Sequence, residues 1–531
     1  MVNSESGPVH KPLPGNPYAQ PVPSAGGKRR RRVILGAGAL ALVLVGAGVF
    51  AVTRGDGGGG GSREPVAAQT RESADGARES ASPEPDADDA DDADDADDAD
   101  DKDDGSAAVI DVNAGRKPGE ARAWLAMNEI RLPGKGAQLF DIWHVRGIVA
   151  QAEHDQVTGY KAADGAKEWS VPLPGEVCDT PVNPTPDGKV VVAYTKSKSE
   201  QNAKCDQLQV IDLKTGAKGW HKELEQKGSL DSTRTTHVAI TGDTALVDQD
   251  MIAHAYRIRD GKRLFTTEKE RDGSCYLYGV AGGGDLLQVE SCVGGNNVSH
   301  SRLKKLDPRT GDVKWRFRSK KGWSVEKVYS VDPVVVAVRN REESEKWAVV
   351  AVDDKGKQRS WVTLDRGPHE FEMCAMAGDS GEGVQNCPGG AVSKDTLYLA
   401  SEPPKGDILG PNKVVAFDLD SGKEKWAGSA EGKRQVTPVA VGGKDRPGVI
   451  VYARPQSERG NGQTVRFGPR GGKPDVLLRH TSAARRTEVG MFAGYTLYAD
   501  GRFFVTPTSL SGKSNGSEGE EGNGRMLSFG R

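Results

Sequence analysis

The chain has 531 residues, including 68 Gly and 29 Pro, and hydrophobic residues make up 36% of it. After the first tenth of the sequence there is no long Leu-rich stretch typical of helices, so the composition favours a β-rich, loop-rich protein. The formal net charge is −3, to which 13 Asp and one Lys in residues 86–104 contribute −12. The remaining +9 includes five basic residues at 28–32, so the folded part is near neutral and lacks the basic stripe that nucleic-acid binding requires.

The first 53 residues predict an uncleaved membrane anchor. Residues 1–32 form a Pro-rich, disordered tail that ends in KRRRR, and residues 33–53 carry no charge over 21 positions. A helix of that length spans about 31 Å, enough to cross a bilayer core. The basic cluster before it predicts a cytoplasmic amino terminus, a single pass through the plasma membrane and an extracytoplasmic remainder. A cleaved signal peptide is the competing interpretation, although the apolar run and its leader are both long for one.

Residues 54–108 predict a disordered linker. It begins with five consecutive glycines at 57–61 and continues into the Asp-rich run, whose charges repel one another and extend the chain. A Ca²⁺ loop ending at Gly105 would need a ligand at Lys102, and a lysine cannot bind a cation. The run is therefore interpreted as a solvated spacer between the anchor and a folded domain at 109–531.

A hairpin with a turn glycine and a later aromatic residue recurs throughout the folded domain. In most copies the aromatic lies four residues after the glycine, as in RTGDVKW, where Gly311 precedes Trp315. The pairs are Gly165 and Trp169, Gly216 and Trp220, Gly261 and Phe265, Gly311 and Trp315, Gly356 and Trp361, and Gly422 and Trp426, followed by Gly471 without an aromatic. These glycines are 51, 45, 50, 45, 66 and 49 residues apart, a period suited to four short strands.

The repeat predicts an all-β fold, an eight-bladed β-propeller of four-stranded blades. In the second unit we expect strands at 189–195, 208–213, 218–224 and 237–243. Two carboxyl-terminal strands, at 502–510 and 525–531, would join the segment at 121–134, which carries Trp124, to close an eighth blade. Closure of this kind removes free sheet edges. Seven blades is the alternative.

The recurring D-x-x-T/D-G-K-x-x-W segment resembles the pyrroloquinoline quinone (PQQ)-like repeat. That repeat occurs in quinoprotein alcohol dehydrogenases and in the propeller lipoprotein of the outer-membrane barrel-assembly machinery. The resemblance implies that the tryptophans dock between adjacent blades, and each indole N–H then needs a partner. The residues concerned are Trp124, Trp169, Trp220, Trp315, Trp361 and Trp426. A ligand-stacking role is the alternative for this set.

All six cysteines lie in the predicted extracytoplasmic part, and an even number there indicates disulfides. The register of the repeat places Cys178 before the first strand of a blade and Cys205 after its second strand. Cys275 and Cys292 take equivalent places one blade later, and Cys387 aligns with Cys178. We therefore predict the pairs Cys178–Cys205, Cys275–Cys292 and Cys374–Cys387, all on one face that also carries the longer loops. Zinc binding is the alternative, but no C-x-x-C motif occurs.

The sequence predicts no enzymatic activity, no cofactor and no metal. Quinoprotein dehydrogenases resemble one another in a vicinal Cys-Cys disulfide over the quinone, and this chain has no adjacent cysteines. There is also no C-x-x-C-H haem site, G-x-S-x-G elbow, H-E-x-x-H motif or P-loop. The nine His residues are scattered, as expected for structural or solvated groups.

We therefore expect a non-catalytic binding scaffold, held at the plasma membrane by residues 33–53. Its partner would be an extracytoplasmic protein, peptide or cell-wall ligand on the face that carries the disulfides. A divergent PQQ-dependent oxidoreductase with a site in the central funnel is the alternative.

Overall fold

The computed structural model describes residues 110–531 with gaps at 135, 198–202, 227–232, 234, 268–273, 295–297, 341, 343–345, 366, 372–373, 375–382, 386, 408, 457–459, 492 and 513–523. The predicted tail (1–32), anchor (33–53) and linker (54–108) lie outside these residues. Within the described part, no helix is long and apolar enough to cross a membrane.

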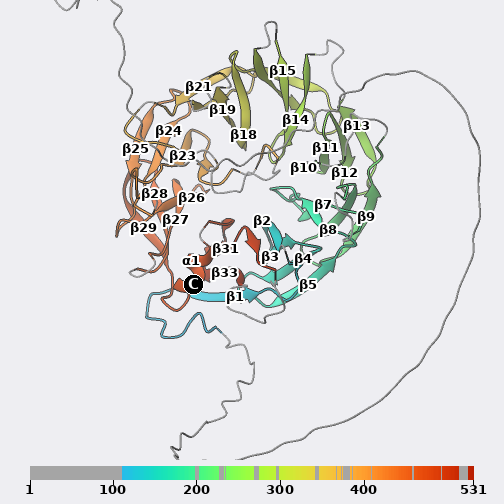
Figure 1. The fold of residues 1–531 in the computed structure, drawn as a ribbon. Helices are drawn as coiled ribbons and strands as arrows, with labels where there is room; N and C mark the ends of the chain where they lie inside the picture. The colour runs from blue at the N-terminus through green and yellow to red at the C-terminus, as the bar shows by residue number, and fades with distance from the viewer. Residues whose placement is uncertain are drawn as a thin grey trace, which may run out of the picture. The chain divides into compact units, whose positions relative to one another are not determined.

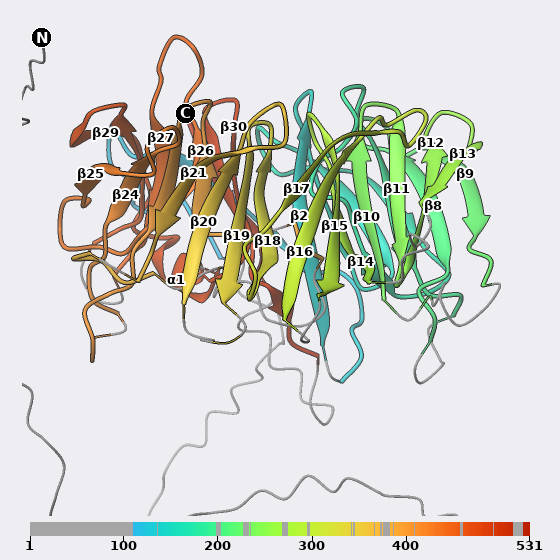
Figure 2. The same ribbon diagram turned by 90° about the horizontal axis from the view of Figure 1, so that it is seen from above.

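Eight antiparallel sheets are arranged in a ring around a central axis (Figure 1), and an edge-on view shows strands crossing the thickness of the ring (Figure 2). Blade 1 contains β2 (Ala137–Val145), β3 (Ile148–Glu153), β4 (Gln156–Lys161) and β5 (Lys167–Pro172), with β32 (Ser509–Leu510) paired to β2. Blade 2 contains β6 (Val177–Asp179), β7 (Lys189–Tyr194), β8 (Gln207–Asp212) and β9 (Lys218–Glu223). Blade 3 contains β10 (Thr236–Thr241), β11 (Thr244–Gln249), β12 (Ile252–Arg257) and β13 (Arg263–Thr267).

The remaining blades follow in chain order. Blade 4 contains β14 (Cys275–Ala281), β15 (Leu286–Val293), β16 (Ser299–Leu306) and β17 (Val313–Arg318). Blade 5 contains β18 (Trp323–Val331), β19 (Val334–Asn340), β20 (Trp347–Val352) and β21 (Gln358–Thr363). Blade 6 contains β22 (Gly390–Val392), β23 (Thr396–Ala400), β24 (Val414–Asp418) and β25 (Glu424–Gly428). Blade 7 contains β26 (Val436–Val441), β27 (Val449–Ala453), β28 (Gln463–Gly468) and β29 (Gly471–Arg479), and the short helix α1 (Arg485–Met491) leads into blade 8.

Blade 8 closes the ring with strands from both ends of the described chain, as the repeat predicts. It contains β30 (Thr496–Ala499), β31 (Arg502–Val505) and β33 (Gly524–Gly530), and β1 (Arg122–Met127) pairs with β33 as the outermost strand. Trp124 of β1 lies opposite Ser528 of β33. The carboxyl-terminal part thus supplies three strands and not the two that we predicted, because β30 is only four residues long and lacks a clear apolar alternation.

The predicted grouping of strands into blades was wrong by one strand, because the last strand predicted for a unit is the first strand of the next blade. Residues 237–243, predicted as the fourth strand of the second unit, fall mostly in β10, which is the first strand of blade 3. The true first strand of blade 2, β6, is three residues long, too short to produce an apolar alternation that a sequence pattern could reveal. In the six blades that carry one of these tryptophans, the Trp-bearing strand is therefore the fourth and outermost strand.

The core consists of eight apolar clusters, one between each pair of neighbouring blades. Alternate residues of a strand point to opposite neighbours: Val190 and Val192 of β7 pack towards blade 1, and Val191 and Ala193 pack towards blade 3. Both faces of the second strand of each blade are therefore buried over most of its length, which explains continuous apolar runs such as KVVVAY. At about 25 cal/mol per Å² of apolar surface removed from water, these clusters are the main source of the stability of the ring.

The repeated tryptophans lie where adjacent blades meet. The indole of Trp169 in blade 1 packs against Gly216, the turn glycine of blade 2, and a Cβ at Gly216 would lie 2.8 Å from the ring. The same contact recurs for Trp124 at Gly165, Trp220 at Gly261, Trp315 at Gly356 and Trp426 at Gly471, while the backbone of Trp361 contacts Gly422 and Phe265 takes the place at Gly311. These glycines also have positive φ, for example +72° at Gly216, so the repeat needs glycine for both the turn and the contact.

The indole N–H groups of these tryptophans do not all find partners. Trp124 donates to Ala162 O at 3.0 Å, Trp220 to Ile258 O at 2.7 Å and Trp426 to Pro469 O at 2.9 Å. The buried Nε1 atoms of Trp169 and Trp315 have no partner among the described residues. The tryptophans thus contact the turn of the neighbouring blade, which is the arrangement that the resemblance implies.

Candidate functional site

Three disulfides lie on one edge of the ring, which we call the stapled face. It is the edge where the first strand of each blade begins and the second strand ends, and the bonds are Cys178–Cys205, Cys275–Cys292 and Cys374–Cys387. These are the pairs that the register predicts. We call these disulfides the first, second and third staple, in chain order. Two details differ from the prediction. Cys178 lies within the first strand β6, and the whole of blade 3 separates the first staple from the second.

The stapled face also carries the longer connections, as expected. Residues 195–206 link β7 to β8 and residues 364–389 link β21 to β22 on this face. On the opposite face, residues 242–243 and 258–262 make the corresponding links in blade 3. Long connections on a rigid frame are the usual place for binding residues.

An exposed apolar patch lies beside the second staple. Tyr276 and Tyr278 are each 39% exposed, and Val293 at the end of β15 is 46% exposed. Alternation along β14 and its register with β15 place these three side chains on the same side of the sheet. Tyr278 donates a hydrogen bond to Glu326 of blade 5, so the patch adjoins the junction of blades 4 and 5.

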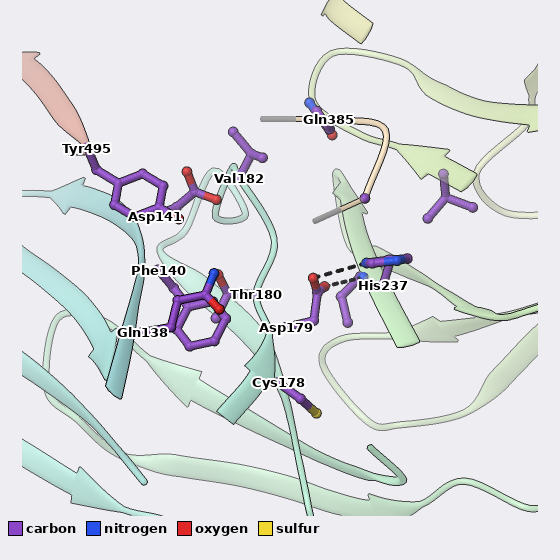
Figure 3. A pocket seen from close by; sticks show the side chains of 13 residues that line it. Gln138, Phe140, Asp141, Cys178, Asp179, Thr180, Val182, His237, Gln385 and Tyr495 are labelled. Atoms are coloured by element: carbon purple, nitrogen blue, oxygen red, sulfur yellow. Dashed lines mark hydrogen bonds and ion pairs between the residues drawn. The ribbon is translucent and has the colours of Figure 1, made fainter. Parts of the chain in front are cut away.

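A small polar cavity of about 60 Å³ opens at the centre of the ring (Figure 3). The innermost strands of blades 1 to 4 line it, with Asp141 from β2, Asp179 from β6 and His237 from β10. Gln385 and Tyr495 complete the wall on the other sides. The cavity has room for a few water molecules.

A carboxylate–imidazole pair forms the polar wall of this cavity. Asp179 Oδ1 lies 3.2 Å from His237 Nδ1, and its Oδ2 accepts a hydrogen bond of 2.7 Å from the backbone N–H of Val238. Burial raises the pKa of Asp179. Burial would lower the pKa of His237, but the hydrogen bond with Asp179 and its charge raise it overall. The pair therefore keeps a proton to a higher pH than water-exposed groups would.

A second carboxyl group lies behind this pair. Asp248 on β11 is opposite His237 in the β10–β11 ladder and only 3% exposed, and its Oδ1 has no partner among the described residues. Burial raises the pKa of Asp248 to about 7, a rise that the charges of Asp250 and Asp179 increase and that of His237 reduces. Asp248 is not among the residues predicted from the sequence, although an Asp inside the buried strand TALVDQ is a signal of an unusual environment.

The described residues 383–385 of the long connection seal the cavity from one side. Val384 O accepts a hydrogen bond of 2.7 Å from Val328 N, and Val384 is buried. The Gln385 side-chain amide makes two hydrogen bonds to the backbone of Gly282, at 2.7 and 2.8 Å. The third staple lies in this same connection, so the disulfide is close in sequence to the residues that line the central cavity.

The residues around this cavity do not fit the quinone that the repeat implies. PQQ is a three-ring tricarboxylate, and ligands of that size occupy pockets of several hundred Å³. The cavity is about 60 Å³, and the carboxyl groups of Asp141 and Asp179 in its wall would repel the carboxylates of the quinone. One cluster in the described part has the spacing of metal ligands, Cys275, Glu290 and Cys292, but its sulfurs are joined in a disulfide and are not available as thiolates.

Comparisons with known proteins place this fold in a family. The sequence profile of the outer membrane protein assembly factor BamB matches residues 107–273 and 279–467. Among solved structures, BamB from Moraxella catarrhalis is 14% identical with a TM-score of 0.41, and the match covers 77% of this chain and 100% of that one. A europium-containing methanol dehydrogenase is 12% identical with a TM-score of 0.45, covering 77% and 94% of the two chains. The quinohemoprotein alcohol dehydrogenase from Comamonas testosteroni is 12% identical with a TM-score of 0.41, covering 77% and 76%. No curated protein matches the chain by sequence.

Proposed function

Since the chain belongs to the family of the outer membrane protein assembly factor BamB, we propose that its propeller is a non-catalytic scaffold that binds proteins or other ligands of the cell envelope. The name of the family refers to the assembly of outer membrane proteins, and we carry over only the general role of binding an envelope partner. The observation that carries the proposal is the stapled face, on which three disulfides, the longer connections and an exposed apolar patch occur together.

The same proposal places the propeller outside the cytoplasm. Disulfides persist in oxidising compartments, and all six cysteines of the chain are paired. The uncharged run at 33–53, preceded by KRRRR, would anchor the chain in the plasma membrane with its amino terminus inside, and residues 54–108 would hold the propeller away from the bilayer.

The patch beside the second staple is the contact surface that we favour. Aromatic residues are enriched at the centres of protein interfaces, where a rigid ring contributes contact area at a small cost in conformational entropy. Tyr276 and Val293 supply such area next to the buried Cys275–Cys292 bond, which fixes their positions relative to each other. An oxidoreductase would need a site for its quinone, and the small acidic cavity at the centre argues against one.

Capture of a partner tests the proposal. The full-length chain, purified in detergent with its disulfides intact, is incubated with an envelope extract, and the retained proteins are identified by mass spectrometry. We expect Tyr276→Ser combined with Val293→Ser to abolish capture. Val441→Ser is the matched control, because Val441 is 38% exposed at the end of a first strand and therefore on the opposite face.

Equal capture by the wild type, the double variant and the control would contradict the choice of face. Titration with PQQ and Ca²⁺ separates the alternative function: we expect no saturable change in absorbance, and such a change would favour an oxidoreductase.

A further inference from the structure

A second cavity lies where the first and last blades meet, and we call it the seam cavity. It has a volume of about 160 Å³ and lies between β33 of blade 8 and β4 and β5 of blade 1, with Glu129 and Ile130 after β1 at its rim. A cavity of this size accepts a molecule about as large as one six-membered ring. The wall is mostly polar, unlike the apolar cluster around Trp124 that fills the rest of the same interface.

A buried ion pair forms the floor of the seam cavity. Arg525 is 1% exposed and Glu153 is fully buried, and Arg525 Nη1 lies 2.7 Å from Glu153 Oε1. Arg525 also donates to the hydroxyl of Tyr160 at 2.8 Å and to Gln151 O at 3.0 Å. A buried ion pair contributes little net stability, because desolvation offsets the attraction. Its presence in the seam therefore calls for an explanation other than stability.

Three buried polar atoms of the wall have no partner among the described residues. They are Glu153 Oε2, Thr158 Oγ1 and Arg525 Nε, and Thr158 and Arg525 are each 1% exposed. The other carboxylate oxygen, Glu153 Oε1, already accepts from Arg525 and from Gln156 at 2.9 Å. A buried polar atom without a hydrogen bond is unfavourable, so these three atoms need a hydrogen-bonding partner from the cavity.

Glu290 provides a comparison, because it is a buried carboxylate whose two oxygens both have partners. Its Oε1 lies 2.6 Å from Lys304 Nζ and 3.1 Å from Gln288 Nε2, and its Oε2 accepts from Arg302. Both oxygens of Glu290 are therefore satisfied within blade 4. By contrast, Glu153 Oε2 accepts no hydrogen bond from the described residues, and Glu153 lines the seam cavity.

The two acidic and two basic side chains of the cavity wall give it no net charge. Arg525 neutralises Glu153 on the floor, and Lys167 pairs with Glu129 at the rim. A charged ligand would add an unbalanced charge in a partly desolvated space, whereas hydroxyl groups can donate to Glu153 and both donate to and accept from Thr158. Ser170 Oγ, which donates to Gln156 at 2.9 Å, still has lone pairs to accept a further hydrogen bond. We propose that the seam cavity binds a compact, uncharged, hydroxyl-rich molecule about the size of one monosaccharide.

This inference does not depend on the protein-binding role, since the seam cavity and the apolar patch of blade 4 lie on different blades. Such a ligand would contact both blade 8 and blade 1, where the ring closes. Its binding would stabilise the closed ring by mass action. Sugar units of an envelope glycan have the required chemistry.

Calorimetric titration of the full-length chain in a sugar-free detergent tests the inference. The probes are glucose, N-acetylglucosamine and myo-inositol, with glucosamine as a cationic and glucuronate as an anionic counterpart. We expect at least one neutral probe to bind at a single site, and its charged counterparts to bind at least about tenfold more weakly. Thr158→Val, which keeps the shape and removes the hydroxyl, should weaken the neutral probe by about tenfold or more.

Ser360→Ala is the matched control, because Ser360 Oγ is also buried without a partner among the described residues but lies in blade 5. It should leave the affinity unchanged. Ser170→Ala, at the partly exposed wall, is a second test variant in case Thr158→Val does not fold, and it should weaken binding several-fold. Failure of every neutral probe to bind would mean that water alone fills the cavity and would overturn the inference. Tighter binding of a charged probe, or unchanged affinity in both wall variants, would overturn it as well.

Discussion

Replacing Asp248 by Asn tests the electrostatics of the central site. The side chain is buried and opposite His237, and burial raises its pKa from 3.8 to about 7. At about 1.4 kcal/mol per pKa unit, a rise of that size corresponds to roughly 4 kcal/mol of coupling between protonation and folding. Asn has nearly the same shape as a protonated Asp and cannot ionise, so Asp248→Asn removes this coupling.

The sign of the effect follows from the two pKa values. Between pH 3.8 and about 7, the folded chain keeps a proton on Asp248 that the unfolded chain has lost. The contribution of this group to the free energy of unfolding is therefore fully present below pH 3.8, decreases as the pH rises to about 7, and is constant above that. From pH 4 to pH 8, Asp248→Asn should thus gain up to roughly 4 kcal/mol of stability relative to the wild type.

Urea unfolding followed by tryptophan fluorescence, at half-unit steps from pH 4 to pH 8, measures this difference. Asp354→Asn is the control, because Asp354 is exposed in the turn between β20 and β21 and the same substitution there should show no such trend. If the difference between Asp248→Asn and the wild type is constant over the whole range, Asp248 ionises as it would in water and this reasoning is wrong.

The contact between blades and the second staple give two further predictions. Gly216→Ala should lower the free energy of unfolding by at least about 1 kcal/mol more than Gly242→Ala, because both positions have positive φ but only the new Cβ at Gly216 would meet a neighbour, the ring of Trp169. Equal losses in chemical denaturation would mean that the tryptophan does not act as a wedge. Replacing both Cys275 and Cys292 by Ser should cost about 3 kcal/mol, since the bond closes a loop with a separation of 17 residues. If this double variant unfolds at the same urea concentration as the wild type, the bond does not stabilise the domain.

The features that repeat along the chain could be predicted from the sequence. The spacing of Gly216 and Trp220, seen again at Gly311 and Trp315, indicates a blade of about 50 residues, and seven such units with matching ends indicate closure. The disulfides follow from the same register, because two cysteines at equivalent strand ends emerge on one face. In these cases a local sequence pattern determines the structure, and its repetition along the chain makes the prediction stronger than one copy would.

The parts that the sequence did not reveal depend on contacts between distant residues. Glu153 and Arg525 are paired across the seam, at opposite ends of the propeller sequence, and no local pattern links them. Their one visible signal is a charged residue in a strand whose neighbours are buried, as in GRMLSFG. The first strand of blade 2 was missed because three residues are too few to show a period.

Crosslinking in intact cells tests the central claim most directly, namely that the stapled face binds a partner in the envelope. A photoreactive amino acid replaces Tyr276 on the stapled face or, as the control, Val441 on the opposite face, and the adducts are identified by mass spectrometry. We predict an adduct with an envelope protein from position 276 and none from position 441. Equal adducts from both positions, or adducts with cytoplasmic proteins alone, would contradict the account.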